Sequence, residues 1–299
     1  MQSAAALVFV ERGLPSGLVP NRDNGVQLFG DLFDGTFSYQ LAVVNGVPDN
    51  VNPTTAELND EKDFAGRVFA QPFKATELGA IRGLGIGIAG GYGRQDGSTS
   101  SPDVPVYRSF GQATFFSFNA ADAPDPENPD EKPAGPVLAN GLRTRVMPQA
   151  YYYYGPFGAL FEYVHGSQEY SRNATKETVD TEAWQIAASY VLTGEPSSYR
   201  GVTPLRAVGP GEGGWGLGAW ELTGRYSELD VDSDVFDAGF ANRTKSAHRA
   251  EEFVVGTNWY LNKNVKFVLN YGETRFDGGA KTGDRPKERA LLTRAQLVF

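Results

Sequence analysis

Alternation of apolar and polar side chains is the dominant pattern along this chain. The segment 253–261 reads FVVGTNWYL and the segment 183–192 reads AWQIAASYVL, and in each of them bulky apolar side chains occupy every second position. A period of two is the signature of a β-strand, because successive side chains of a strand point to opposite faces. No stretch shows an apolar helical stripe bounded by capping residues. We therefore predict an all-β chain.

The same pattern predicts eleven strands. They span residues 25–33, 36–45, 63–72, 83–94, 143–153, 157–169, 181–192, 217–228, 250–261, 264–276 and 288–299. Short connections such as Asp34-Gly35 join several neighbouring strands, and Asp-Gly suits the positive φ angles of a tight hairpin turn. Other connections are long and acidic, as in residues 119–136. Alternating short and long connections are typical of an outer-membrane β-barrel, with tight periplasmic turns and long extracellular loops.

A soluble β-sandwich that binds or hydrolyses sugars is the alternative, because its strands also have a period of two. The predicted strands are mostly ten or more residues long, against a usual five or six, and aromatic residues lie near their ends. Both features favour an antiparallel transmembrane β-barrel. The two folds differ in whether one set of apolar residues faces lipid or a closed core. This set comprises Trp184, Tyr190, Phe253, Val255 and Phe267.

Composition excludes several functional classes. The 299 residues include no Cys and two His, and 27 Lys and Arg stand against 36 Asp and Glu, for a net charge of -9. The absence of Cys excludes disulfides and thiolate metal sites, and the acidic balance argues against nucleic acid as a partner. A G-x-G-x-x-G motif at Gly85–Gly90 lies within a predicted strand, not between a strand and a helix, so it does not predict a dinucleotide site. We predict no enzymatic activity and no metal or organic cofactor.

The last predicted strand, 288–299, reads ERALLTRAQLVF and ends on Phe299. A final amphipathic strand that ends on an aromatic residue resembles the targeting signal of outer-membrane proteins, so Phe299 is the candidate targeting residue. Further segments resemble the phosphate-selective porin O/P family. They are DFAGRVFAQPF (63–73), QAYYYYGPFGALFEYV (149–164), WQIAASYVLTGE (184–195), GAWELTGRYSELD (218–230) and NWYLNKNVKFVLNY (258–271).

This resemblance implies a sixteen-stranded barrel in the outer membrane, usually a homotrimer surrounded by lipid. Such a barrel passes phosphate, polyphosphate or other small anions through a basic lumen. A general or sugar-type porin is the main alternative. The resemblance covers nearly the whole chain but begins in mid-barrel, so we expect the chain to correspond to the C-terminal two thirds of such a porin.

The expected organisation is a single porin domain over residues 1–299, with residues 1–24 as an inward loop and 25–299 as barrel strands. Counting strand directions back from the C-terminus places 95–142 in one extracellular excursion, within which 109–118 forms an arm over or into the pore. The same count places the long connection 193–216 in the periplasm.

Candidate site residues follow from the faces of the strands, since lipid-facing and lumen-facing positions alternate in a barrel. The polar faces place six cations in the lumen as an anion path: Arg67, Arg143, Arg145, Arg225, Lys266 and Arg294. Arg12 and Arg22 are candidates in the inward loop. The planar guanidinium of Arg can hold a phosphate with two hydrogen bonds. The alternative is that these cations pair with Asp63, Glu162 and Glu221 on the same wall.

Overall fold

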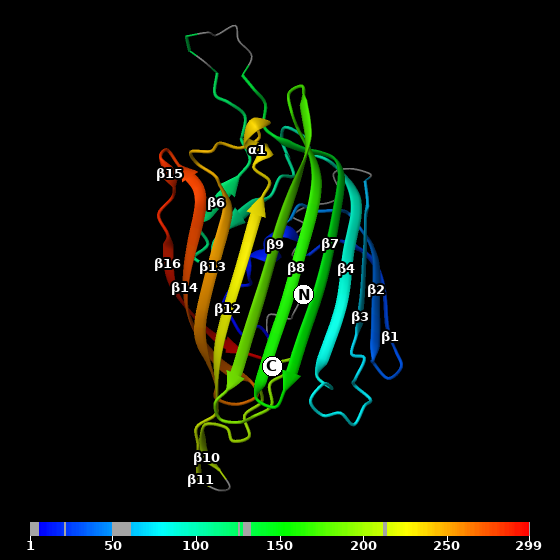
Figure 1. Ribbon diagram of the computed structural model, residues 1–299, viewed down its shortest axis with the longest axis vertical. Coiled ribbons are helices and arrows are strands. Elements are labelled where there is room, and N and C mark those ends of the chain that lie inside the picture. Colours follow the sequence, from blue (N-terminus) through cyan, green and yellow to red (C-terminus); the bar gives the residue numbers. More distant parts are fainter. Residues whose placement is uncertain are drawn as a thin grey trace.

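The computed structural model describes residues 6–20, 22–49, 61–124, 126–127, 133–211 and 214–298, and most of its strands form one large antiparallel sheet (Figure 1). Its strands are β1 (Gly25–Leu32), β2 (Phe37–Val44), β3 (Asp63–Ala70), β4 (Leu84–Asp96), β7 (Leu138–Tyr154), β8 (Phe157–Arg172), β9 (Thr175–Val191), β12 (Ala219–Val231), β13 (Ala247–Tyr260), β14 (Val265–Ala280), β15 (Gly283–Asp284) and β16 (Glu288–Leu297). They follow one another across the sheet in chain order, except that β14 pairs with both β15 and β16. Within the described residues, β1 pairs with β2 alone and β16 with β14 alone.

Each of the eleven predicted strands corresponds to one strand of this sheet, which confirms the predicted all-β, antiparallel barrel architecture. The two largest errors are at strand starts: β7 begins at Leu138 instead of residue 143, and β9 begins at Thr175 instead of residue 181. The first four residues of β9 are all exposed, so no buried face imposes an alternating pattern on them. Backbone pairing with β8, down to Arg172 opposite Thr175, extends the strand instead.

Connections at the two ends of the sheet differ in length. At the bottom of Figure 1, the end predicted to be periplasmic, residues 33–36 join β1 to β2 and residues 155–156 join β7 to β8. Asp34 and Gly35 both have positive φ angles there, 54° and 75°, as the Asp-Gly turn required. The connection 192–218 at this end is long and contains the small hairpin of β10 (Gly209–Gly211) and β11 (Gly214–Gly216).

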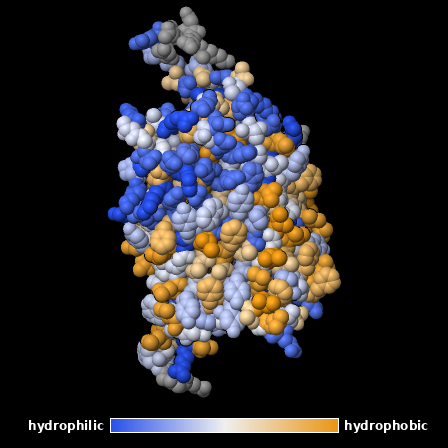
Figure 2. Space-filling model, in the orientation of Figure 1, coloured by the Kyte–Doolittle hydropathy of each residue, from blue (hydrophilic) through white to orange (hydrophobic). Residues whose placement is uncertain are grey.

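Apolar side chains cover the outer face of the sheet. Tyr190 and Phe253 are 50 % and 54 % exposed, and Val255 and Phe267 are exposed as well. Figure 2 shows apolar residues gathered over the lower part and the right side of one face, with hydrophilic residues over its upper left. Trp184 is half-buried beside Tyr226, with ring centroids 5.2 Å apart. Contiguous exposed apolar surface of this kind fits lipid and not the closed core of a sandwich.

The inner face of the sheet holds a second layer made by loops. The connection between β4 and β7 contains β5 (Val106–Arg108) and β6 (Thr114–Ser117), which pair with each other, while β4 pairs directly with β7. Phe115 and Phe116 of β6 are fully buried, and the Phe115 ring lies 5.8 Å from that of Phe276 on β14. The predicted arm therefore folds into the interior, where aromatic burial holds it.

Two short helices complete the described structure. The 3-10 helix η1 (Leu14–Leu18) packs on the inner side against β8, β9 and β12, with Leu14 and Leu18 buried. Helix α1 (Asp234–Asp237) lies in the connection between β12 and β13. No helix within the described ranges has the length and hydropathy required to cross a membrane.

Candidate functional site

Two cavities lie on the inner face, on either side of a short stretch of chain before η1. The first has a volume of about 340 Å³ and is bordered by β3, β7, β8 and β9, and the second, of about 320 Å³, lies toward the β5–β6 arm. Glu11, Arg12 and Gly13 line both cavities, so this stretch separates them. A Cβ atom on Gly13 would lie 1.9 Å from Oε1 of Gln185, so only glycine lets the chain approach the wall this closely.

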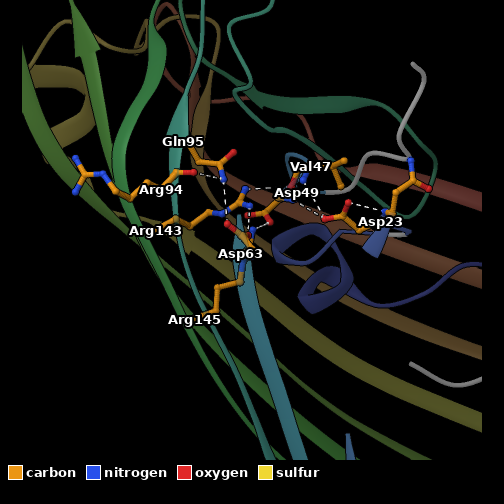
Figure 3. A network of polar contacts seen from close by, with 10 residues as sticks. Asp23, Val47, Asp49, Asp63, Arg94, Gln95, Arg143 and Arg145 are labelled. Atoms are coloured by element: carbon orange, nitrogen blue, oxygen red, sulfur yellow. Dashed lines mark hydrogen bonds and ion pairs between the residues drawn. The ribbon is translucent and has the colours of Figure 1, made fainter. Parts of the chain in front are cut away.

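Arg143 and Arg145 lie two residues apart on β7 and both point inward, as Figure 3 shows. Each forms an ion pair with an aspartate: Arg143 with Asp63 of β3, and Arg145 with Asp49 of the loop after β2. Arg143 also donates a hydrogen bond to the carbonyl oxygen of Val47 at 3.1 Å. Both arginines are more than nine-tenths buried, so they anchor this loop to the wall.

Arg225 of β12 is held in a similar way. It pairs with Glu252 of β13 at 3.1 Å, and both side chains are 1 % exposed. It also donates to the carbonyl oxygen of Glu11 at 2.8 Å, and its guanidinium lies 4.7 Å from the centre of the Phe9 ring. Since burial of an unpaired charge is costly, Glu252 offsets the cost of burying the Arg225 charge in this position.

Three of the predicted cations bind uncharged groups. Arg67 donates two hydrogen bonds to Oε1 of Gln149, at 3.0 and 3.2 Å, and lies 4.7 Å above the Phe69 ring. Lys266 donates to the carbonyl oxygen of Leu7 at 2.8 Å. Arg294 donates to the carbonyl oxygens of Leu7 and Val10, at 3.1 and 3.4 Å. The positive charge of Arg67 and Arg294 is therefore not cancelled by a carboxylate in these hydrogen bonds.

The remaining predicted residues lie in different places. Arg12 lines both cavities. Arg22 is exposed and borders neither of them. Phe299 lies outside the described residues. The structure thus brings Arg12 together with Arg67, Arg145 and Arg225 around the first cavity, and sets Arg22 apart from them.

Three residues of this wall were not singled out from the sequence. Glu252 and Gln185 directly precede or follow an apolar residue of the opposite face, Phe253 and Trp184, so alternation along each strand contained the signal that would have found them. Asp49 lies in a loop without a periodic pattern, and no feature of the sequence connects it with Arg145.

Burial changes the acidity of two carboxyl groups at the inner wall. Burial raises the pKa of Glu11, although Arg294 and Arg225 act in the opposite direction. Burial also raises the pKa of Asp49 above its usual range, against the opposing effect of Arg145. Both groups therefore take up a proton at a higher pH than an exposed carboxyl group. Their charge, and with it the charge balance of the wall, depends on pH.

The chemistry available at this wall is electrostatic. Fixed guanidinium groups border both cavities, and such groups attract anions and repel cations. Within the described part of the chain, no group of three or more His, Asp or Glu residues is arranged to hold a metal ion.

Comparison with known proteins identifies one family. The family model for phosphate-selective porin O and P matches residues 9–299. Porin O of Pseudomonas aeruginosa is 30% identical over 146 residues, which are 48% of this chain and 33% of that protein. The chain thus spans about a third of the length of this curated relative.

The solved structure of an outer membrane channel shows the same type of fold. The outer membrane channel DcaP of Acinetobacter baumannii matches with a TM-score of 0.53 and 9% identity, over 98% of this chain and 68% of that one. The outer membrane protein OmpT of Vibrio cholerae matches with a TM-score of 0.46 and 10% identity, over 99% and 74% of the two chains. At this identity, the likeness to DcaP concerns the fold alone.

Proposed function

Because the chain belongs to the phosphate-selective porin O and P family, we propose that it forms a channel through which phosphate and other small anions diffuse passively. Its family and fold place it in the outer membrane and make it a channel protein, not an enzyme, as the sequence predicted. The proposal assigns the selectivity to fixed cations on the inner wall.

The observation that best supports this proposal is the arrangement of Arg67. Its guanidinium borders the first cavity, and the hydrogen bonds described for it go to the neutral amide of Gln149. Among the described residues this guanidinium forms no ion pair, and it can exchange the amide for the oxygen atoms of a passing phosphate. Arg12, which borders the same cavity and the next one, provides the following step toward the arm.

The predicted cations thus fall into two groups with different roles. Arg143, Arg145 and Arg225 are ion-paired and hold loops and wall together. Arg67 and Arg294 donate the hydrogen bonds described for them to neutral groups, and we assign the anion path to these two together with Lys266 and Arg12. The net charge of -9 does not oppose this path, because exposed charges are screened within about 8–10 Å at physiological salt.

The partners of the channel belong to the same proposal. The exposed apolar side chains of the outer face support contact with outer-membrane lipid. A homotrimer is the assembly that the resemblance to the porin family implies.

Ion selectivity of an Arg67→Gln variant tests the proposal. The full-length protein and the variant are reconstituted in planar bilayers, and the anion-to-cation permeability ratio is obtained from reversal potentials in a KCl gradient. We expect a lower ratio for the variant. Arg200→Gln is the control. Arg200 is exposed in the connection between β9 and β12, so this substitution removes the same charge outside the cavities. Equal ratios for the two variants would refute the assignment of the path to Arg67.

A further inference from the structure

The wall of the first cavity combines a hydrogen-bond donor with unused acceptor capacity. Arg67 borders the cavity as a fixed donor, whereas Glu162 and Gln185 border it as acceptors. Gln185 is 9% exposed and donates through Nε2 to the Glu162 carboxylate, but its Oε1 atom has no hydrogen-bond partner among the described residues. This oxygen packs against Gly13, where a Cβ atom would lie 1.9 Å from it, so the acceptor that this wall offers to a ligand is the half-exposed Glu162 carboxylate.

Aromatic and hydroxyl groups border the same cavity toward the end that we predict to be periplasmic. Tyr153 lines the cavity, and its ring lies 5.3 Å from that of Tyr151, which stacks on Tyr199 at 5.3 Å and 29°. Ser189 and Ser197 also line it. The aromatic rings therefore lie beside hydroxyl groups that can donate or accept hydrogen bonds.

The long connection 192–218 supplies part of this wall. The backbone N–H of Ser197 donates to the carbonyl oxygen of Gly155 at 2.8 Å, which fastens the connection to the turn between β7 and β8. Tyr199 follows two residues later and stacks on Tyr151. The length of this connection, unusual for a periplasmic turn, thus has a structural use: it closes the aromatic end of the cavity.

We propose that the first cavity is a binding subsite for sugar phosphates, which rests on the proposed anion channel and names its organic substrate class. The guanidinium of Arg67 binds the phosphate, and the carboxylate of Glu162 and the hydroxyl of Ser189 form hydrogen bonds with sugar hydroxyls. The ring of Tyr153 packs against the apolar C–H groups of the sugar. Inorganic phosphate alone would leave the aromatic part of the wall unused.

The size of the cavity agrees with this class. Its volume of about 340 Å³ lies at the lower end of the range of small-molecule sites, about 300–1,000 Å³. Such sites usually combine apolar or aromatic walls with a few polar groups that fix the orientation of the ligand. Arg67, Glu162 and Tyr153 provide a donor, an acceptor and an aromatic ring around a single cavity.

Block of the ion current by glucose 6-phosphate tests this subsite. The full-length protein is reconstituted in planar bilayers in KCl, and the half-blocking concentrations of glucose 6-phosphate, inorganic phosphate and glucose are compared. We expect glucose 6-phosphate to block at a concentration about tenfold lower than inorganic phosphate, as one or two additional hydrogen bonds would produce, and glucose to block least.

Two variants and a matched control distinguish loss of the subsite from a general loss of channel structure. Ser189→Ala removes a hydroxyl group that lines the cavity, and Tyr153→Ala removes the ring. Both should raise the half-blocking concentration of glucose 6-phosphate toward that of inorganic phosphate and leave the latter unchanged. Tyr154→Ala is the control, because Tyr154 follows on the same strand and is 54% exposed on the outer face. This variant should behave as the wild type does.

Equal block by glucose 6-phosphate and inorganic phosphate in the wild type would overturn the subsite. An equal effect of the two variants on both blockers would do so as well. Neither result bears on the anion channel itself, because the permeability ratio of the Arg67→Gln variant in KCl tests that channel without any sugar phosphate.

Discussion

Arg143 on β7 and Asp63 on β3 form a buried ion pair across β4, the strand that lies between them. The pair can form because β4 has Gly93 opposite Arg143 in the register of the two strands. A Cβ atom on Gly93 would lie 1.7 Å from Oδ1 of Asp63 and 3.0 Å from its Cα atom. A missing side chain on one strand thus permits a contact between its two neighbours.

Gly93→Ala should therefore destabilise the barrel by about 1–3 kcal/mol, as overpacking does at other tightly packed sites. Gly91→Ala is the matched control on the same face of β4, since its new Cβ atom would meet its nearest neighbour at 3.7 Å, an ordinary contact. Thermal unfolding in detergent, followed by circular dichroism, measures both. The explanation fails if the two variants lower the melting temperature equally.

Removing one partner of the pair should cost more than removing both. Arg143→Gln leaves the carboxylate of Asp63 buried beside Arg145, 3.9 Å away, and the amide of Gln95, which donates to it at 3.3 Å. The loss of its closest cation should destabilise the barrel by about 3–5 kcal/mol. Adding Asp63→Asn removes the uncompensated charge, so the double variant should unfold at a higher temperature than Arg143→Gln alone. A double variant that is less stable than the single variant would show that Asp63 has another stabilising role.

Acidification should make the channel more selective for anions. Burial raises the pKa of Asp49, so this carboxyl group is protonated at a pH at which an exposed Asp, with a pKa of about 3.9, is still ionised. Protonation removes the negative partner of Arg145, and the charge of Arg145 then adds to the positive potential of the first cavity. Because the folded-state pKa is raised, this protonation also favours the folded state as the pH falls from the raised value toward the ordinary one.

The Asp49→Asn variant isolates the contribution of Asp49. It should show a higher anion-to-cation permeability ratio at neutral pH and a smaller increase on acidification than the wild type. Asp237→Asn is the control, since Asp237 pairs with Arg243 at 2.7 Å on the exposed helix α1, outside the cavities. A pH response of the same size in Asp49→Asn and in the wild type would assign the effect to other groups, such as Glu11, whose pKa is also raised by burial.

The period of two was sufficient to predict the strands and the faces of their side chains. Arg225 and Lys266 point inward as the alternation required, because a strand that is apolar on one side fixes its register. The partners of these cations could not be predicted. Arg225 binds the carbonyl of Glu11 and Lys266 that of Leu7, more than 200 residues away in the sequence. Such contacts depend on how loops enter the interior, and loops have no periodic pattern.

The sequence also could not predict which inward cations form ion pairs and which bind uncharged groups. Arg67 and Arg145 are both inward arginines on neighbouring parts of the wall, yet one binds an amide and the other an aspartate. The difference arises from the position of Asp49, which the loop after β2 brings to Arg145. Alternation determines which face of the sheet a side chain points to, but not which residues it contacts on that face.

The reversal potential of the wild-type, full-length channel tests the central claim most directly. It is measured in a planar bilayer that separates concentrated from dilute KCl at neutral pH. The account predicts a potential of the sign given by chloride flow, because the cations around the first cavity favour anions over cations. A potential near zero, or one of the sign given by potassium flow, would contradict an anion-selective path along this wall.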